Sequence, residues 1–170
     1  MVLKVYERIE SIAEENVDAE NQRTLTLPFD LRQKSRLKAT LDNKTEVGLM
    51  LPRGGLLRGG DLLRAEDGTV IKVVSAAESV SKVTHSDPLM IMRASYHLGN
   101  RHVPLQISDD YLCYTHDHVL DEMVIGLGLQ VECVMAPFEP EGGAYGGGHK
   151  HGDDDHNEAH HHSHTHQHSH

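Results

Sequence analysis

The sequence predicts an α+β protein with two folded domains and a C-terminal tail. Residues 1–74 show short alternating strand patterns and turn signals without a sustained helical period, which is typical of an all-β domain. Residues 80–140 follow the order strand, helix, strand, strand, helix, strand, the split βαβ pattern of a ferredoxin-like domain. Residues 75–79 separate the two as a short hinge. Residues 141–170 lack the apolar surface needed to offset the entropy of ordering, so we expect a disordered tail.

Turn residues and glycine pairs divide the N-terminal domain. The turns are expected at Asp42-Asn43-Lys44 and Glu66-Asp67-Gly68. The pairs Gly54-Gly55 and Gly59-Gly60 break any helix in their neighbourhood. Between these breaks, polar and apolar residues alternate or β-favouring residues cluster. The expected strands are 2–6, 23–27, 37–41 and 69–74.

Helix start and stop signals define the second domain. Ser86 or Asp87 is suited to cap a helix whose first turn contains Pro88, and Gly99-Asn100 ends that helix. A second helix is expected near 117–127, because its apolar residues recur on one face. The expected strands of this domain are 80–84, 103–107, 111–115 and 129–136.

Composition excludes several classes of function. The chain has 170 residues and a formal charge of −10, and it lacks a basic stripe, so nucleic acid is not an expected partner. No apolar stretch is long enough for a membrane helix. Charged residues near the N-terminus interrupt the segment that a signal peptide would need, which predicts a cytoplasmic protein.

The two cysteines, Cys113 and Cys133, are too few for a disulfide framework. In a reducing compartment we expect both to be small buried hydrophobic residues. A role as thiolate ligands or in regulation is the alternative.

Ten of the 15 histidines lie between residues 149 and 170. Neutral imidazole is a good ligand for nickel, copper and zinc, so this composition predicts metal binding without selecting one metal. An engineered purification tag is the competing interpretation, although a tag is usually an uninterrupted run. The candidate ligands in the tail are His149, His151, His156, His160, His161, His162, His164, His166, His168 and His170.

The second domain contains a further cluster, His116-Asp117-His118, at a predicted boundary between strand and helix. The two imidazoles are either metal ligands or surface residues. Asp117 either caps the helix or holds an imidazole in one tautomer. His97 lies at a helix C-terminus, where the helix dipole favours a cation and a structural role. His102 and His85 are weaker candidates for metal ligands.

Four motifs resemble the UreE family of urease accessory nickel metallochaperones, and the resemblance covers essentially the whole chain. The most specific is the signature-like run from Tyr96 to Gln106, YHLGNRHVPLQ. The other three, in chain order, are LPRGGLLRGGDL at 51–62, HDHVLD at 116–121 and PFEPEGGAY at 137–145. A His-rich terminus follows them.

The resemblance implies an N-terminal protein-binding domain, a ferredoxin-like metal domain and a head-to-head homodimer formed through the second domain. It assigns His97 to a metal site at the dimer interface, and His116 and His118 to a peripheral site. His102 and Asp117 are expected to be structural or to support the ligands. Some relatives have a histidine where this chain has Thr115, so the peripheral site is expected to be weaker or differently completed. The tail histidines are expected to contribute metal ligands as a group, without any one of them being assigned.

We therefore expect a carrier of Ni(II), not an enzyme, which donates the ion to apo-urease together with a urease accessory GTPase. Zn(II) or Cu(II) can bind the same ligands, because copper normally competes well with nickel for imidazole. A general divalent-metal buffer that binds only through its tail is one alternative. A zinc hydrolase built on His97, His116 and His118 is another, but the sequence offers no obvious general base.

Overall fold

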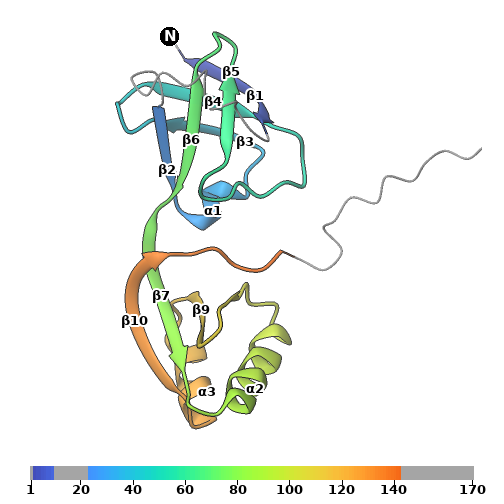
Figure 1. The fold of residues 1–170 in the computed structure, drawn as a ribbon, viewed down its shortest axis with the longest axis vertical. Coiled ribbons are helices and arrows are strands. Elements are labelled where there is room, and N and C mark those ends of the chain that lie inside the picture. Colours follow the sequence, from blue (N-terminus) through green and yellow to red (C-terminus); the bar gives the residue numbers. More distant parts are fainter. Residues whose placement is uncertain (1, 10–22, 143–170) are drawn as a thin grey trace, which may run out of the picture.

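The computed structural model describes residues 2–9 and 23–142. Within these ranges the chain forms an N-terminal domain of mostly strands and a C-terminal α+β domain (Figure 1). No helix in these ranges is long and apolar enough to cross a membrane. All but two residues of the expected tail, 141–170, lie outside the described part of the chain.

The N-terminal domain is built on a six-stranded sheet with the strand order β2-β6-β5-β1-β4-β3. The pairs β1–β4 and β2–β6 are parallel, and the other neighbours are antiparallel. Buried aliphatic residues from these strands form one core, in which Val5, Leu25, Leu63 and Ile71 are fully inaccessible to solvent. The elements are β1 (Leu3–Ile9), β2 (Arg23–Leu27), α1 (Phe29–Arg32), β3 (Arg36–Thr40), β4 (Glu46–Met50), β5 (Leu62–Ala65) and β6 (Val70–Ser75).

Sequence patterns located the strands that become β1, β2, β3 and β6 but missed β4 and β5. Gly48 interrupts the apolar pattern of β4, although Val47 and Leu49 on either side of it are buried. β5 has only four residues and follows the glycine-rich segment that suggested a loop. The domain is also not purely β, because Phe29–Arg32 forms one helical turn.

The C-terminal domain has the order β7-α2-β8-β9-α3-β10, and its sheet has the strand order β10-β7-β9-β8. All neighbouring strands in this sheet are antiparallel. The elements are β7 (Ala77–Thr84), α2 (Pro88–Gly99), β8 (Gln106–Ile107), β9 (Tyr111–Thr115), α3 (His118–Gly126) and β10 (Gln130–Pro137).

The two helices pack on one face of this sheet through a shared core. Ala94 and Leu98 of α2 and Val124 of α3 are buried against strand residues such as Leu112 and Tyr114. Alternate residues of the strands face the opposite side, where Val80 and Cys113 form a smaller cluster. Side chains of β9 therefore alternate between the helix-covered face and the face that carries this cluster.

The segment Ser75–Ser79, expected to be a hinge, is almost entirely strand. β6 continues to Ser75 and β7 begins at Ala77, so Ala76 alone separates them. Pairing between β7 and β10 begins at the first residue of β7, where Ala77 is opposite Pro137. The chain thus passes from one sheet to the other with almost no intervening loop (Figure 1).

The two domains also meet through a buried arginine. Arg32 is fully buried, and it donates hydrogen bonds to the carbonyl oxygens of Leu57 and Phe138 and to the carboxylate of Glu139. Phe29 and Phe138 pack edge to face beside it, with ring centroids 5.3 Å apart. The domain contact therefore combines an aromatic pair with a charged, hydrogen-bonded centre.

Candidate metal centre

His97 lies in the last turn of α2, as expected from the helix stop signal. The helix begins at Pro88, and the Asp87 side chain accepts a hydrogen bond from the Leu89 amide. Ala94 and Leu98 anchor the buried side of the helix, which leaves the His97 ring half-buried at the boundary of that side. The ring packs edge to face against Tyr96, with centroids 5.4 Å apart.

An exposed apolar stripe follows the same helix. The exposed fractions are 46% for Leu89, 60% for Met92 and 67% for Tyr96. Their spacing of three and four residues places them on one face of α2. Large apolar side chains gathered on one exposed face are typical of a protein–protein contact surface. His97 is adjacent in sequence to the last residue of this stripe.

His116 is held in place by hydrogen bonds from two neighbouring elements. Its Nδ1 atom lies 3.1 Å from the Asp121 carboxylate and 3.1 Å from the Ser81 hydroxyl. The alternation of β9 explains this position, because residues 112, 114 and 116 point toward the helices. When Nδ1 carries the proton and donates to Asp121, Nε2 keeps its lone pair for a metal ion. About 39% of the His116 side chain is exposed to solvent.

Asp121, and not Asp117, is the carboxylate that supports this imidazole. Asp117 caps α3 by accepting from the amides of Val119 and Leu120, which decides between the two roles that the sequence allowed. Asp121 also accepts a 2.7 Å hydrogen bond from the Tyr114 hydroxyl. Burial and the neighbouring Asp121 raise the pKa of Tyr114, which keeps its hydroxyl protonated as a donor.

Sequence reasoning overlooked both Asp121 and Tyr114. An acidic residue in the first turn of the helix that follows a histidine cluster is the signal that could have pointed to Asp121. Tyr114 gave no separate signal, because an aromatic residue in a strand is ordinarily a core residue.

The remaining histidines of the second domain are dispersed. His118 begins α3 and is exposed, and His102 is exposed in a left-handed backbone conformation with a φ of 57°. His85 accepts a hydrogen bond from the Asp87 amide at the start of α2. Thr115 is exposed at the end of β9. In residues 2–9 and 23–142, no group of three or more His, Cys, Asp or Glu side chains is placed to hold one metal ion.

The cysteines differ from each other. Cys113 is buried as expected, and burial raises the pKa of its thiol. Cys133 is exposed on β10, so the expectation that it is buried was wrong. It lies opposite Ser81, on the face of the sheet that carries the helices, and its Sγ atom is 3.3 Å from the Ser79 hydroxyl.

The ten tail histidines, from His149 to His170, lie outside the described residues. Their role as ligands stays a prediction.

The fold and these sites define a two-domain α+β protein that presents single imidazoles at the surface of its second domain. Comparison with known proteins identifies the group to which it belongs. The family model for the N-terminal domain of the UreE urease accessory protein matches residues 5–76, and the model for the C-terminal domain matches residues 78–170. The chain belongs to the UreE family, and the resemblance found in the sequence is confirmed.

Individual relatives agree with this assignment. Urease accessory protein UreE of Alkalilimnicola ehrlichii is 63% identical over 124 residues, which are 73% of this chain and 76% of the relative. The protein of the same name from Burkholderia lata is 56% identical over 131 residues, which cover 77% of this chain and 63% of the relative. The one from Cupriavidus necator is 58% identical over 130 residues, covering 76% of this chain and 68% of the relative.

Proposed function

We propose that this protein is a metallochaperone that carries Ni(II) and donates it to apo-urease during assembly of the urease active site. The observation that carries the proposal is the family match, which extends over both domains in order. The relatives are named as urease accessory proteins, which supports a role beside the enzyme and not as a catalyst. We expect the protein to work in the cytoplasm with a urease accessory GTPase.

The primary nickel site is proposed at His97 in a homodimer. The exposed stripe of Leu89, Met92 and Tyr96 supports pairing of two copies through α2, since burying it stabilises the dimer. In a symmetric dimer the same patch serves both protomers, so two copies of His97 come together. The element order and the strand order of this domain support a ferredoxin-like topology as the scaffold of the site.

Two imidazoles leave the coordination shell of nickel incomplete. Histidines from 149–170 are proposed to supply further ligands, because attachment to the same chain gives them an effective concentration on the order of millimolar. An incomplete shell suits a protein that must release its ion, whereas a closed structural site would retain it. His116, oriented by Asp121, and His118 are proposed as a weaker peripheral site.

A general divalent-metal buffer is the second candidate function, and the ten histidines between 149 and 170 favour it. The two functions differ in where the ion is bound. A buffer holds its metal through the tail alone, whereas a carrier keeps a site at His97.

Calorimetric titration with nickel distinguishes the two functions. A variant that lacks 149–170 should retain one tight nickel site per dimer, and His97→Ala in the full chain should lose that site. His102→Asn is the matched control, since it removes an exposed imidazole while asparagine tolerates the left-handed conformation there. If the truncated chain binds no nickel, the buffer is correct. If His97→Ala keeps the tight site, the proposed ligand is wrong.

A further inference from the structure

The strand β10 presents two sulfur-containing side chains on one face. Cys133 is opposite Ser81 of β7, and Met135 is opposite Ser79. Paired residues of antiparallel strands point to the same face of a sheet, as do residues two apart on one strand. Ser81 is in turn opposite Tyr114 of β9, a residue of the core beneath the helices. Cys133 and Met135 are therefore neighbours on the helix-bearing face, on the strand that forms the edge of the sheet (Figure 1).

Packing in the core does not account for this pair. Cys133 is exposed, and the exposed fraction of Met135 is 68%, the largest among the large hydrophobic residues of the described ranges. Val131 and Val134 of the same strand pack against the two clusters of the domain, whereas Cys133 and Met135 belong to neither cluster. Both sulfur-containing residues are thus exposed side by side on one strand.

A contact with β7 orients the thiol along the strand. The Sγ atom of Cys133 lies 3.3 Å from the Oγ atom of Ser79. Ser79 is opposite Met135 and not opposite Cys133, so this contact runs diagonally between the two strands. The thiol is therefore turned toward the end of β10 at which Met135 lies. Residues two apart on a strand are separated by about 6.7 Å, and methionine has three rotatable bonds, so the two sulfur atoms can reach one ion.

The pair is separate from the imidazole of the proposed peripheral site. On the same face β7 carries only the small side chains Ser79 and Ser81 beside the pair, and the Ser81 hydroxyl lies 3.1 Å from Nδ1 of His116. Within residues 2–9 and 23–142, His, Cys, Asp and Glu side chains do not gather in threes around a point that one ion could occupy. The donors that β10 itself offers are therefore the two sulfur atoms.

The chemistry of these donors selects one kind of metal ion. Thiolate and thioether sulfur are soft ligands and favour Cu(I), whereas nickel is well suited by imidazole. The usual protein ligands of zinc are thiolate, imidazole and carboxylate, and a thioether is not among them. Cu(I) also accepts a shell of only two donors. A cysteine and a methionine on one strand face therefore fit Cu(I) better than Ni(II) or Zn(II).

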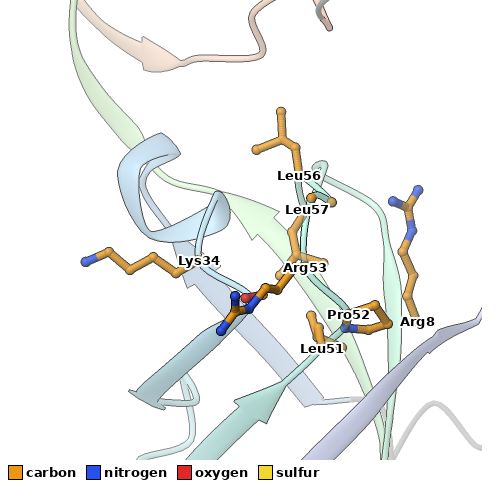
Figure 2. A pocket seen from close by; sticks show the side chains of 10 residues that line it. Arg8, Lys34, Leu51, Pro52, Arg53, Leu56 and Leu57 are labelled. Carbon is orange, nitrogen blue, oxygen red and sulfur yellow. The ribbon is translucent and has the colours of Figure 1, made fainter. Parts of the chain in front are cut away.

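The charge of the second domain favours a cation. Residues 77–142 contain ten acidic and three basic side chains, and β10 contains no basic residue. A surface of this sign raises the local concentration of cations. The cavity of the N-terminal domain beside the loop between β4 and β5 is the opposite case, because Arg8, Lys34 and Arg53 line it and no acidic residue, histidine or cysteine does (Figure 2). The electrostatic preference for a metal ion is thus confined to the domain that carries the sulfur pair.

We propose that Cys133 and Met135 form a binding site for Cu(I). Cys133 binds as a thiolate and releases its proton to solvent, Met135 binds through the thioether lone pair, and the copper remains Cu(I). The Ser79 hydroxyl donates a hydrogen bond to the thiolate. The site uses none of the proposed nickel ligands, so it does not depend on the proposed function.

Competition for Cu(I) tests the proposal. The full-length protein is titrated without oxygen into the Cu(I) complex of bathocuproine disulfonate, and the absorbance of that complex reports how much copper the protein removes. Met135→Leu should weaken the tight site by about tenfold or more, and Cys133→Ser should abolish it, because each removes a soft donor. Met50→Leu is the matched control, since it removes an exposed thioether of the other domain and should bind as wild type does. All of these proteins keep the ten tail histidines, so copper held by the tail is the same in each.

Alkylation of the thiol locates the ion. Cu(I) should slow the reaction of Cys133 with iodoacetamide in the wild type, as followed by mass spectrometry of the peptide that contains it, and should protect it much less in Met135→Leu. Ni(II) at the same concentration should leave the rate unchanged. Circular dichroism establishes that the variants are folded. Leucine and methionine are similar in volume, so Met135→Leu tests the site even if Cys133→Ser does not fold.

Three outcomes would overturn the proposal. Unchanged Cu(I) affinity in Met135→Leu would show that the thioether is not a ligand. Equal losses in Met135→Leu and Met50→Leu would show that the effect is not specific to β10. Protection of Cys133 by Ni(II) as strong as that by Cu(I) would show that the site does not select a soft ion.

Discussion

The Arg32 guanidinium and the Glu139 carboxylate join the two domains through a 2.9 Å ion pair between residues 107 positions apart in the sequence. Glu139 also accepts hydrogen bonds from the Gly59 amide and from Arg58. One carboxylate of the C-terminal domain therefore binds three groups of the N-terminal domain. Gly59 permits this approach, because a Cβ atom there would lie 3.1 Å from the Glu139 carboxylate.

Arg32→Met should destabilise the protein and loosen the domain contact. The change leaves the Phe138 carbonyl and the Glu139 carboxylate without their buried donor, a loss of about 3 kcal/mol. The measurement is chemical denaturation of the wild type and the variant. Arg64→Met is the control, because its ion pair with Glu7 is about half exposed and should be worth less than about 1 kcal/mol. Equal losses in both variants would mean that the buried pair has no special role.

Acid should weaken the domain contact through Glu139. Desolvation raises the pKa of this carboxyl, but the Gly59 amide, Arg32 and Arg58 outweigh it, so its pKa is lowered from the usual 4.5. A lowered pKa in the folded state contributes stability that is complete above about pH 4.5 and is lost as the pH falls through the folded value. Glu139→Gln should therefore be less stable than the wild type at neutral pH, and the difference should shrink below pH 4.5. A difference that is independent of pH would contradict this account.

Asp121→Asn should weaken the peripheral metal site while leaving the fold intact. An amide is a poorer partner than a carboxylate for the Nδ1 proton of His116, so affinity at this site should fall by about 10- to 100-fold. Asp117→Asn is the matched control, since asparagine caps a helix as well as aspartate does. Metal titration of both variants in a chain that lacks 149–170 and carries His97→Ala isolates this site. Loss of affinity in Asp117→Asn alone would show that the wrong carboxylate had been assigned.

The sequence predicted the elements of the second domain well because their signals are local. Asp87, Pro88 and Gly99 mark the ends of α2 by rules that depend on a few neighbouring residues. Contacts between distant residues had no such signal. Nothing near Arg32 indicates that it is buried against Glu139, and the partner of His116 proved to be Asp121 instead of the adjacent Asp117. The position of His97 at a helix end suggested only a structural role. The resemblance to a known family, and not the periodicity of the sequence, made it a candidate metal ligand.

Replacing residues of the apolar stripe should separate dimerisation from metal binding. Met92→Glu/Tyr96→Glu places four charges at the centre of a symmetric interface, so the protein should become monomeric in light scattering. If nickel is shared between two copies of His97, this variant should also lose the tight site although His97 is intact. His97→Ala should lose the same site but remain dimeric, because its ring is only half-buried and lies at the edge of the core. In a reconstituted assay at limiting nickel, both variants should activate urease poorly. Full activation by His97→Ala would mean that 149–170 or the His116–His118 pair delivers the nickel. If the Met92→Glu/Tyr96→Glu variant is still a dimer, the dimer interface does not include this stripe.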